Sequence, residues 1–261
     1  MIHESHSEFV KGPRVNLEVY VQGSGPALIV LPSYGRDGGA DFDRFASRVS
    51  TAGFSVLRPQ PRGIAGSAGA MDGVTVHDLA DDVAMVIREL TVGKAVVLGH
   101  AFGNGVARML AVDHPSLVLG VILAAAQCSS VPPEIAKTPH QACDLTAPVE
   151  SRLDALRRGF FAPNHDPRIW LEGWFPQTMR MQENCAATVR ATDYWGAGAA
   201  PVLEIIPEYD PFKPRPYWEE LRRQLRDRVT AEIVADASHA LFPEQPDQVA
   251  DVVVHWCQQL R

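Results

Sequence analysis

Residues 95–105 read Ala-Val-Val-Leu-Gly-His-Ala-Phe-Gly-Asn-Gly, and this stretch constrains the fold more than any other part of the chain. The apolar run Ala95–Leu98 predicts a buried strand, and apolar residues at helical spacing follow the turn. Gly99 and Gly103 stand two positions before and two positions after Ala101. In a sharp strand-to-helix turn the tip residue is held in a strained, positive-φ conformation, and side chains at those two positions would collide with it. The sequence therefore predicts a sharp turn at the carboxyl edge of a sheet, with Ala101 at its tip.

Small residues two positions either side of a reactive tip are the pattern of a nucleophile elbow. The tip of such an elbow is normally a serine, a cysteine or an aspartate, whereas Ala101 has no nucleophilic atom. The backbone N–H groups at the start of the following helix remain available to negative charge. The stretch thus predicts the scaffold of a hydrolase without its catalytic nucleophile. A glycine-rich turn with no chemical role is the alternative.

The composition and charge restrict the partners of this chain. Its 261 residues are enough for one large α/β domain or two small ones, and 46% of them are hydrophobic. A net charge of −7 argues against nucleic acid and against an anionic membrane as partners. No apolar run reaches the roughly 20 residues that a membrane-spanning helix needs.

The amino terminus and the cysteines indicate a cytoplasmic location. The opening Met-Ile-His-Glu-Ser-His-Ser-Glu has neither a basic start nor an apolar core, so it does not have the pattern of a signal peptide. The 4 cysteines are far apart and show no paired spacing typical of a metal site, so we expect reduced thiols. Neither a metal nor an organic cofactor is expected, because no ligand cluster or phosphate-binding glycine pattern stands in the right context.

Strands and helices alternate along most of the chain. A hairpin is expected at residues 9–11 and 17–21, and apolar runs predict strands at 27–31, 54–57, 95–98, 121–125, 202–206 and 231–234. Helices are expected at 42–52, 76–90, 218–227 and 246–260, and from the sharp turn to His114. This alternation predicts an α/β fold whose mostly parallel central sheet is flanked by helices. Residues 127–197 interrupt it.

Three further segments complete a resemblance to the α/β-hydrolase fold superfamily that covers nearly the whole chain. Residues 204–212, Glu-Ile-Ile-Pro-Glu-Tyr-Asp-Pro-Phe, resemble the acid loop of that family, and residues 235–243, Ala-Asp-Ala-Ser-His-Ala-Leu-Phe-Pro, resemble its histidine loop. Residues 62–67 are similar to the family's loop after an earlier strand. The resemblance implies a core domain made of residues 1–126 and 198–261, with residues 127–197 as a helical cap.

The same resemblance implies the roles of the site residues. Ala101 takes the nucleophile position, Asp210 the position of the acid and His239 that of the base. Asp210 and His239 have other interpretations. Asp210 precedes a proline and could simply start a turn, with the nearby carboxylate of Glu208 as a substitute acid, and His239 could be a surface histidine. An aspartate at the carboxyl end of a strand is nevertheless where such sheets meet their ligands.

An oxyanion hole of two backbone N–H groups is also implied. One belongs to Phe102, directly after the tip, and the other to Tyr34, in the turn after the strand at 27–31. The family often carries His-Gly in that turn, whereas this chain has Pro-Ser-Tyr-Gly at 32–35. Backbone donors do not depend on side-chain identity, so the hole is still expected.

The cap segment 127–197 is rich in aromatic residues, which predicts a largely apolar pocket for a small hydrophobic or aromatic substrate. Trp174 and Phe161 from this segment, together with His100 beside the tip, are the expected substrate-binding residues. The alternative for each ring is that it only holds the cap to the core. Arginines of the segment could be solvated or could face a substrate carboxylate: Arg157, Arg158 and Arg168.

Three explanations of Ala101 remain open at this stage. Alanine could be an engineered replacement of a serine, in which case the chain is an inactivated hydrolase. It could instead be native, with His239 and Asp210 activating water or abstracting a proton as in a lyase. In the third, catalysis is lost and the pocket only binds a ligand. We expect a hydrolase that cleaves an ester, lactone or related carbonyl bond of a small hydrophobic molecule by a Ser-His-Asp mechanism, seen here in an inactivated form with Ala101 in place of the nucleophile. The oligomeric state, a homodimer included, is left open.

Overall fold

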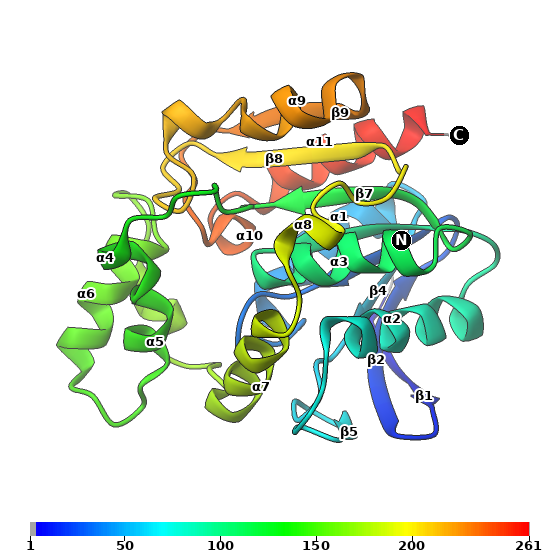
Figure 1. Ribbon diagram of the computed structural model, residues 1–261, viewed down its shortest axis with the longest axis horizontal. Coiled ribbons are helices and arrows are strands. Elements are labelled where there is room, and N and C mark those ends of the chain that lie inside the picture. The colour runs from blue at the N-terminus through cyan, green and yellow to red at the C-terminus, as the bar shows by residue number, and fades with distance from the viewer. Residues whose placement is uncertain (1–3, 261) are drawn as a thin grey trace.

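The computed structural model describes residues 4–260, and its strands form a sheet in the order β1–β2–β4–β3–β6–β7–β8–β9 (Figure 1). β1 and β2 form the predicted hairpin, and β2 pairs antiparallel with β4. The neighbouring strands in the sheet order β4–β3–β6–β7–β8–β9 are parallel to one another. The bounds are β1 His6–Lys11, β2 Val15–Gly23, β3 Ala27–Leu31, β4 Ser55–Pro59, β6 Ala95–His100, β7 Val118–Ala124, β8 Val202–Pro207 and β9 Val229–Val234, with the short β5 Ala68–Gly69 against β2. The predicted α/β fold with a mostly parallel sheet is confirmed.

Helices cover both faces of this sheet. α1 (Ala40–Thr51) and α11 (Pro246–Gln259) lie on one face, and α2 (Val76–Leu90) and α3 (Phe102–Asp113) lie on the other (Figure 1). Side chains alternate along each strand, so Leu28 and Val30 pack under α1 and α11 while Ile29 and Leu31 pack under α2 and α3. The central strands are therefore apolar on both faces, as their continuous apolar runs indicate.

One predicted helix is shorter in the structure. In place of a helix over 218–227, α9 spans Glu220–Leu225 between two 3₁₀ turns, Arg215–Tyr217 and Arg226–Arg228. Arg226 has a φ of 53°, which an α-helix cannot contain, so the helix ends before it.

The segment 127–197 is helical, as expected. It contains α4 (Pro133–Ala136), α5 (Thr138–Cys143), α6 (Val149–Gly159), a 3₁₀ turn (Pro167–Trp170), α7 (Pro176–Ala187) and α8 (Ala191–Tyr194). In Figure 1, α4, α5 and α6 lie beyond the carboxyl ends of β7 and β8, and α8 lies beside α3. Phe160, Phe161, Trp170 and Trp174 form the centre of a separate apolar cluster in this segment.

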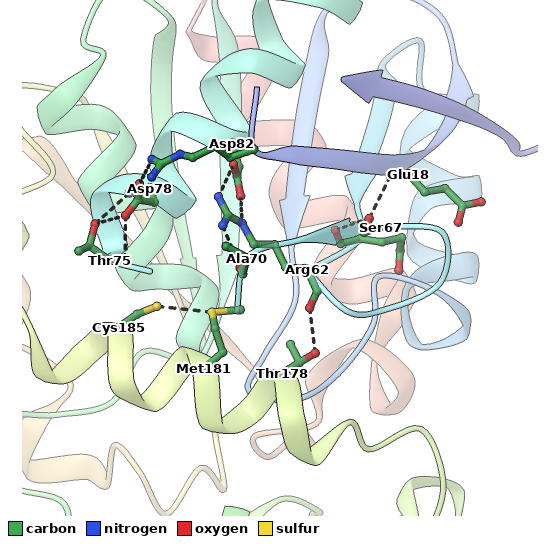
Figure 2. A network of polar contacts seen from close by, with 12 residues as sticks. Glu18, Arg62, Ser67, Ala70, Thr75, Asp78, Asp82, Thr178, Met181 and Cys185 are labelled. Atoms are coloured by element: carbon green, nitrogen blue, oxygen red, sulfur yellow. Dashed lines mark hydrogen bonds and ion pairs between the residues drawn. The ribbon is translucent and has the colours of Figure 1, made fainter. Parts of the chain in front are cut away.

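The loop that follows β4 attaches α7 to the core (Figure 2). The buried Arg62 forms two hydrogen bonds with Asp82 of α2, at 2.7 and 2.9 Å. The hydroxyl of Thr178 on α7 donates to the carbonyl of Arg62 at 2.9 Å. Ser67 of the same loop accepts from the Glu18 N–H of β2. One short loop thus links β2, α2 and α7.

None of the helices in the described part of the chain is long and apolar enough to cross a bilayer. Residues 1–3 of the stretch on which the signal-peptide prediction rests lie outside the described residues.

Candidate active site

Ala101 stands at the tip of a sharp turn between β6 and α3. Its backbone has φ 49° and ψ −107°, the positive-φ conformation that the glycine spacing predicts. A Cβ at Gly99 would lie 2.3 Å from the carbonyl carbon of Gly103, and a Cβ at Gly103 would lie 2.5 Å from the carbonyl oxygen of Leu31. Neither position admits a side chain, so the two glycines are what allow the tip to form.

Asp210 and His239 lie in hydrogen-bond contact at the carboxyl ends of β8 and β9. The His239 Nδ1 is 3.0 Å from one Asp210 carboxylate oxygen and 3.2 Å from the other, and both residues are buried, at 5% and 2% exposure. The Phe212 N–H donates to the same carboxylate at 2.9 Å, so Asp210 starts a turn and holds the imidazole at once. With Nδ1 engaged, Nε2 is the ring nitrogen left for chemistry in the cavity that His239 lines. Glu208 instead accepts from the Asp236 N–H.

Three rings hold the imidazole of His239 in place. Its centroid lies 4.4 Å from that of Phe212, 5.5 Å from that of Phe160 and 5.6 Å from that of His100. His100 is buried behind the site, and its Nε2 lies 2.8 Å from the carbonyl oxygen of His239. Burial, with His239 close by, lowers the pKa of His100 from 6.5 to about 3, so the ring is neutral and donates through Nε2–H.

A cavity of about 400 Å³ opens over Ala101 and His239. Trp174 lines it, as expected, but the other two expected substrate-binding residues do not. His100 is directed away from it, toward Phe42 and Phe242, and Phe161 packs edge-on against Trp170 within the helical segment. The neighbouring Phe160 lines the cavity instead, a one-residue difference that the composition of the segment could not resolve.

Tyr34 and Phe102 meet at the tip, with their ring centroids 4.6 Å apart, and both line the cavity. Phe102 is the first residue of α3, so its N–H has no acceptor within the helix. No hydrogen bond from the Tyr34 N–H is found among the residues that the structure describes. Both residues therefore line the cavity, and their N–H groups are unengaged within the described part of the chain.

The turn that carries Tyr34 is held from α7, which the sequence did not reveal. The Gly35 N–H donates to the side-chain oxygen of the buried Gln182 at 2.7 Å, and the Phe175 N–H donates to the Gly35 carbonyl at 2.8 Å. Gly35 has a φ of +56°, and a Cβ there would lie 2.9 Å from the Cβ of Met179. The segment 127–197 therefore positions this turn.

Glu244 is a second buried residue that the sequence did not single out. Its carboxylate accepts from the Ser238 N–H and from the Ala162 N–H, both at 2.6 Å, which joins the histidine loop to the chain just after Phe161. Burial raises the pKa of this carboxyl above its usual value, although the two backbone donors oppose the shift.

The arginines considered for a substrate carboxylate do not line the cavity. Arg158 pairs with Asp154, Arg168 pairs with Asp166, and Arg157 is exposed. Arg108 of α3 lines the cavity instead. It is seven positions after Ala101, and residues 101, 104, 105 and 108 share one face of a helix, a spacing from which its position could have been predicted.

The site offers side chains for acid–base chemistry rather than metal binding. Within residues 4–260 no group of three or more His, Cys, Asp or Glu side chains is placed to hold a metal ion. The cysteines at 128, 143, 185 and 257 are buried free thiols.

Comparisons with known proteins agree with this architecture. A family model described as alpha/beta hydrolase fold matches residues 26–145. The chain is 31% identical to the 2-(acetamidomethylene)succinate hydrolase of Mesorhizobium japonicum over 42% of its own length and 38% of that protein. It is 27% identical to the "Putative carbamate hydrolase RutD" of Variovorax paradoxus over 86% of its own length and 89% of that protein. A thermophilic esterase from Thermogutta terrifontis superposes with a TM-score of 0.78 at 20% identity, over 98% of this chain and 99% of that one, which shows a common fold.

Proposed function

The chain belongs to the α/β-hydrolase fold superfamily, and from this premise we propose that its cavity hydrolyses an ester, lactone or related carbonyl bond of a small molecule. One observation carries the proposal: His239, held by the buried Asp210, lines the same cavity as Tyr34 and Phe102, whose backbone N–H groups are unengaged within the described residues. A general base beside an oxyanion hole is the arrangement that acyl transfer requires.

In the chain as it stands, water is the nucleophile that we propose. His239 Nε2 removes a proton from water while the water oxygen attacks the carbonyl carbon. Asp210 stabilises the imidazolium that forms, and the Tyr34 and Phe102 N–H groups bind the oxyanion. The imidazolium then protonates the leaving group, which departs as an alcohol or amine and leaves a carboxylic acid. Protons and electrons balance without a cofactor.

Ala101 permits a second form of the same function. If alanine replaces a natural serine, a hydroxyl at this tip would attack the substrate itself, and an acyl-enzyme would form before water completes the reaction. The chain would then be the inactivated form of a Ser-His-Asp hydrolase. The two forms share base, acid and oxyanion hole and differ only in the nucleophile.

Two features bear on the bond and the substrate. The relatives are named as hydrolases of a carbamate and of an acetamidomethylene compound, so we include carbon–nitrogen bonds next to a carbonyl among the related bonds. Trp174, Phe160 and Phe212 give the cavity an apolar wall, which favours a small substrate with apolar surface.

Proton abstraction by His239 without hydrolysis, and ligand binding without catalysis, are the competing functions. The absence of a nucleophile at Ala101 favours both. A pure binding site has no need of the buried Asp210–His239 pair, because two titratable side chains held behind a cavity are costly to bury. We therefore place hydrolysis first.

The test is labelling with a fluorophosphonate, which reacts with an activated hydroxyl. The chain with Ala101 should not be labelled, and Ala101→Ser should be labelled rapidly. Ala101→Ser with His239→Ala should lose at least about a hundredfold in rate, because general-base catalysis contributes roughly 10²–10⁴. Equal labelling with and without His239 would show that the pair does not activate the tip, and the proposed function would fall.

Turnover then separates the two forms. Ester hydrolysis by the Ala101 chain that disappears in His239→Ala indicates the water route. Turnover that arises only in Ala101→Ser indicates a serine enzyme. Binding of cavity ligands with no turnover in either chain indicates a receptor and contradicts the proposal.

A further inference from the structure

Arg108 is a buried cation at the wall of the cavity, and the proposed reaction does not use it. Its exposure is 3%, and its guanidinium lies 4.1 Å from the centre of the Trp195 ring. Nη1 donates to the Trp195 carbonyl at 2.6 Å. A guanidinium has five N–H donors, and no second hydrogen bond from Arg108 is found among residues 4–260.

No ion pair balances the charge of Arg108 within the described residues. The carboxylate that acts on it electrostatically is that of Glu204 on β8, and one Glu204 oxygen is already paired with the buried Lys213. Glu220 influences Glu204, but its carboxylate accepts from the Ser129 N–H and is not among the groups that act on Arg108. A cation without its own counter-ion therefore borders the cavity.

The charge persists despite this burial. Desolvation lowers the pKa of Arg108 from 12.5 to about 10, with Glu204 and Tyr194 opposing the shift. The guanidinium is therefore protonated at neutral pH. A buried charge of this kind is unfavourable unless an anion compensates it.

The helix fixes the distance between Arg108 and the tip. Seven residues along α3 separate the Arg108 Cα from that of Ala101 by about 10 Å, and helical side chains lean toward the amino end, which shortens the gap. Tyr194, the last residue of α8, and Trp195, which follows it, line the cavity beside Arg108. A molecule of a few carbon atoms would span from the oxyanion hole to the guanidinium.

We propose that Arg108 binds a carboxylate of the substrate, so that the cavity takes a small acid whose scissile carbonyl group lies a few bonds from a free carboxylate. The inference rests on the proposed function for the position of the scissile bond. Bidentate hydrogen bonding to a carboxylate is the geometry that a guanidinium favours, and four of the five Arg108 N–H groups remain for it. Hydrophobic contacts with Phe160 and Trp174 then act on the part of the substrate between or beyond these groups.

Binding of amide probes to the protein tests this inference. The probes are succinamic, glutaramic and adipamic acids, which carry one carboxylate and one amide, and the matched neutral diamides. Isothermal titration calorimetry should show that the protein binds at least one acid about tenfold or more tightly than its diamide. Arg108→Gln should weaken binding of that acid by about ten- to a hundredfold, the range for a hydrogen-bonded charge, and leave the diamide unchanged. Arg108→Lys should retain part of the preference. The exposed Arg157→Gln, which removes one positive charge from the surface, should behave as the unmodified chain.

Each outcome either supports or overturns the proposed carboxylate site at Arg108. No preference for any acid in the unmodified protein overturns the proposal, and this readout stands even if Arg108→Gln fails to fold. Equal losses for acid and diamide in a folded Arg108→Gln would assign the residue a structural role at the Trp195 carbonyl and also overturn it. Because amides are used and binding is measured, an acid preference without ester turnover supports the carboxylate site while the hydrolase proposal falls. Ester turnover without an acid preference gives the reverse.

Discussion

The neutral state of the buried His100 should make the protein sensitive to acid. His100 is the second residue of the elbow segment Gly99–Gly103, and its Nε2–H holds the carbonyl of His239. Burial lowers its pKa to about 3 in the folded protein, against 6.5 for an exposed histidine. Below pH 6.5 the unfolded chain therefore takes up a proton that the folded chain refuses.

The magnitude follows from linkage. For one proton the free energy of unfolding changes by about 1.4 kcal/mol per pH unit, and it decreases as the pH falls because the unfolded state binds more protons. Across the window from pH 6.5 to about 3 the loss reaches roughly 5 kcal/mol, which is comparable to the whole stability of many proteins. Above pH 6.5 both states are neutral at this residue and the contribution is constant.

Urea unfolding at a series of pH values measures this slope, and His100→Gln isolates it. The variant loses stability at all pH values because its packing and its ring hydrogen bond change, but its slope below pH 6.5 should be smaller by one proton. The exposed His255→Gln serves as the control for removing a histidine. Imidazole NMR gives an independent reading, in which the His100 ring should not titrate near pH 6.5. Identical slopes in the unmodified protein and His100→Gln would refute the reasoning.

Two further perturbations test the supports of the site. Gln182→Leu removes the acceptor that fixes the turn carrying Tyr34, so fluorophosphonate labelling measured in the Ala101→Ser background should slow by about tenfold or more; an unchanged rate would mean that other contacts fix the turn. Asp82→Asn leaves the buried Arg62 uncompensated and should cost about 3–5 kcal/mol in urea unfolding. Asp247→Asn, which breaks the exposed pair with Arg44, should lower the free energy of unfolding by under about 1 kcal/mol. Similar losses for Asp82→Asn and Asp247→Asn would contradict the importance of burial.

The sheet and its helices were predictable from the sequence because their signals are local. Continuous apolar runs such as Ala27–Leu31 identify strands that are covered on both faces, and the observed strand has the same bounds. The helix Val76–Leu90 also agrees, since its apolar spacing is regular and Thr75 caps it. The helix predicted at 218–227 was too long because the observed helix ends before Arg226, which has a positive φ. An arginine in the sequence does not indicate that conformation.

The site was predictable only where chemistry is tied to a strand end. Asp210 and His239 lie in the loops after β8 and β9, three and five residues beyond the strand ends, so the parallel sheet brings them to one edge, and the structure places them in contact. Whether Phe160 or Phe161 lines the cavity depends on how the chain turns after α6, and no sequence pattern indicates that turn. Gln182 acts across 147 positions of the sequence, and no local pattern marks such a contact.

The backbone of the elbow is strained although its tip residue, Ala101, carries no nucleophile. Positive φ at a residue other than glycine costs on the order of 1–3 kcal/mol, and Ala101 adopts it at a turn where Gly99 and Gly103 let the backbone pass too closely for a Cβ at either position. Phe102 begins α3, so its N–H has no acceptor within the helix, and the residue lines the cavity that His239 also lines. The proposed oxyanion donor therefore depends on the turn and not on a nucleophile at its tip, and a water-based hydrolysis needs such a donor as much as a serine-based one. This is why the oxyanion donors and the acid–base pair, rather than the residue at position 101, carry the proposed function.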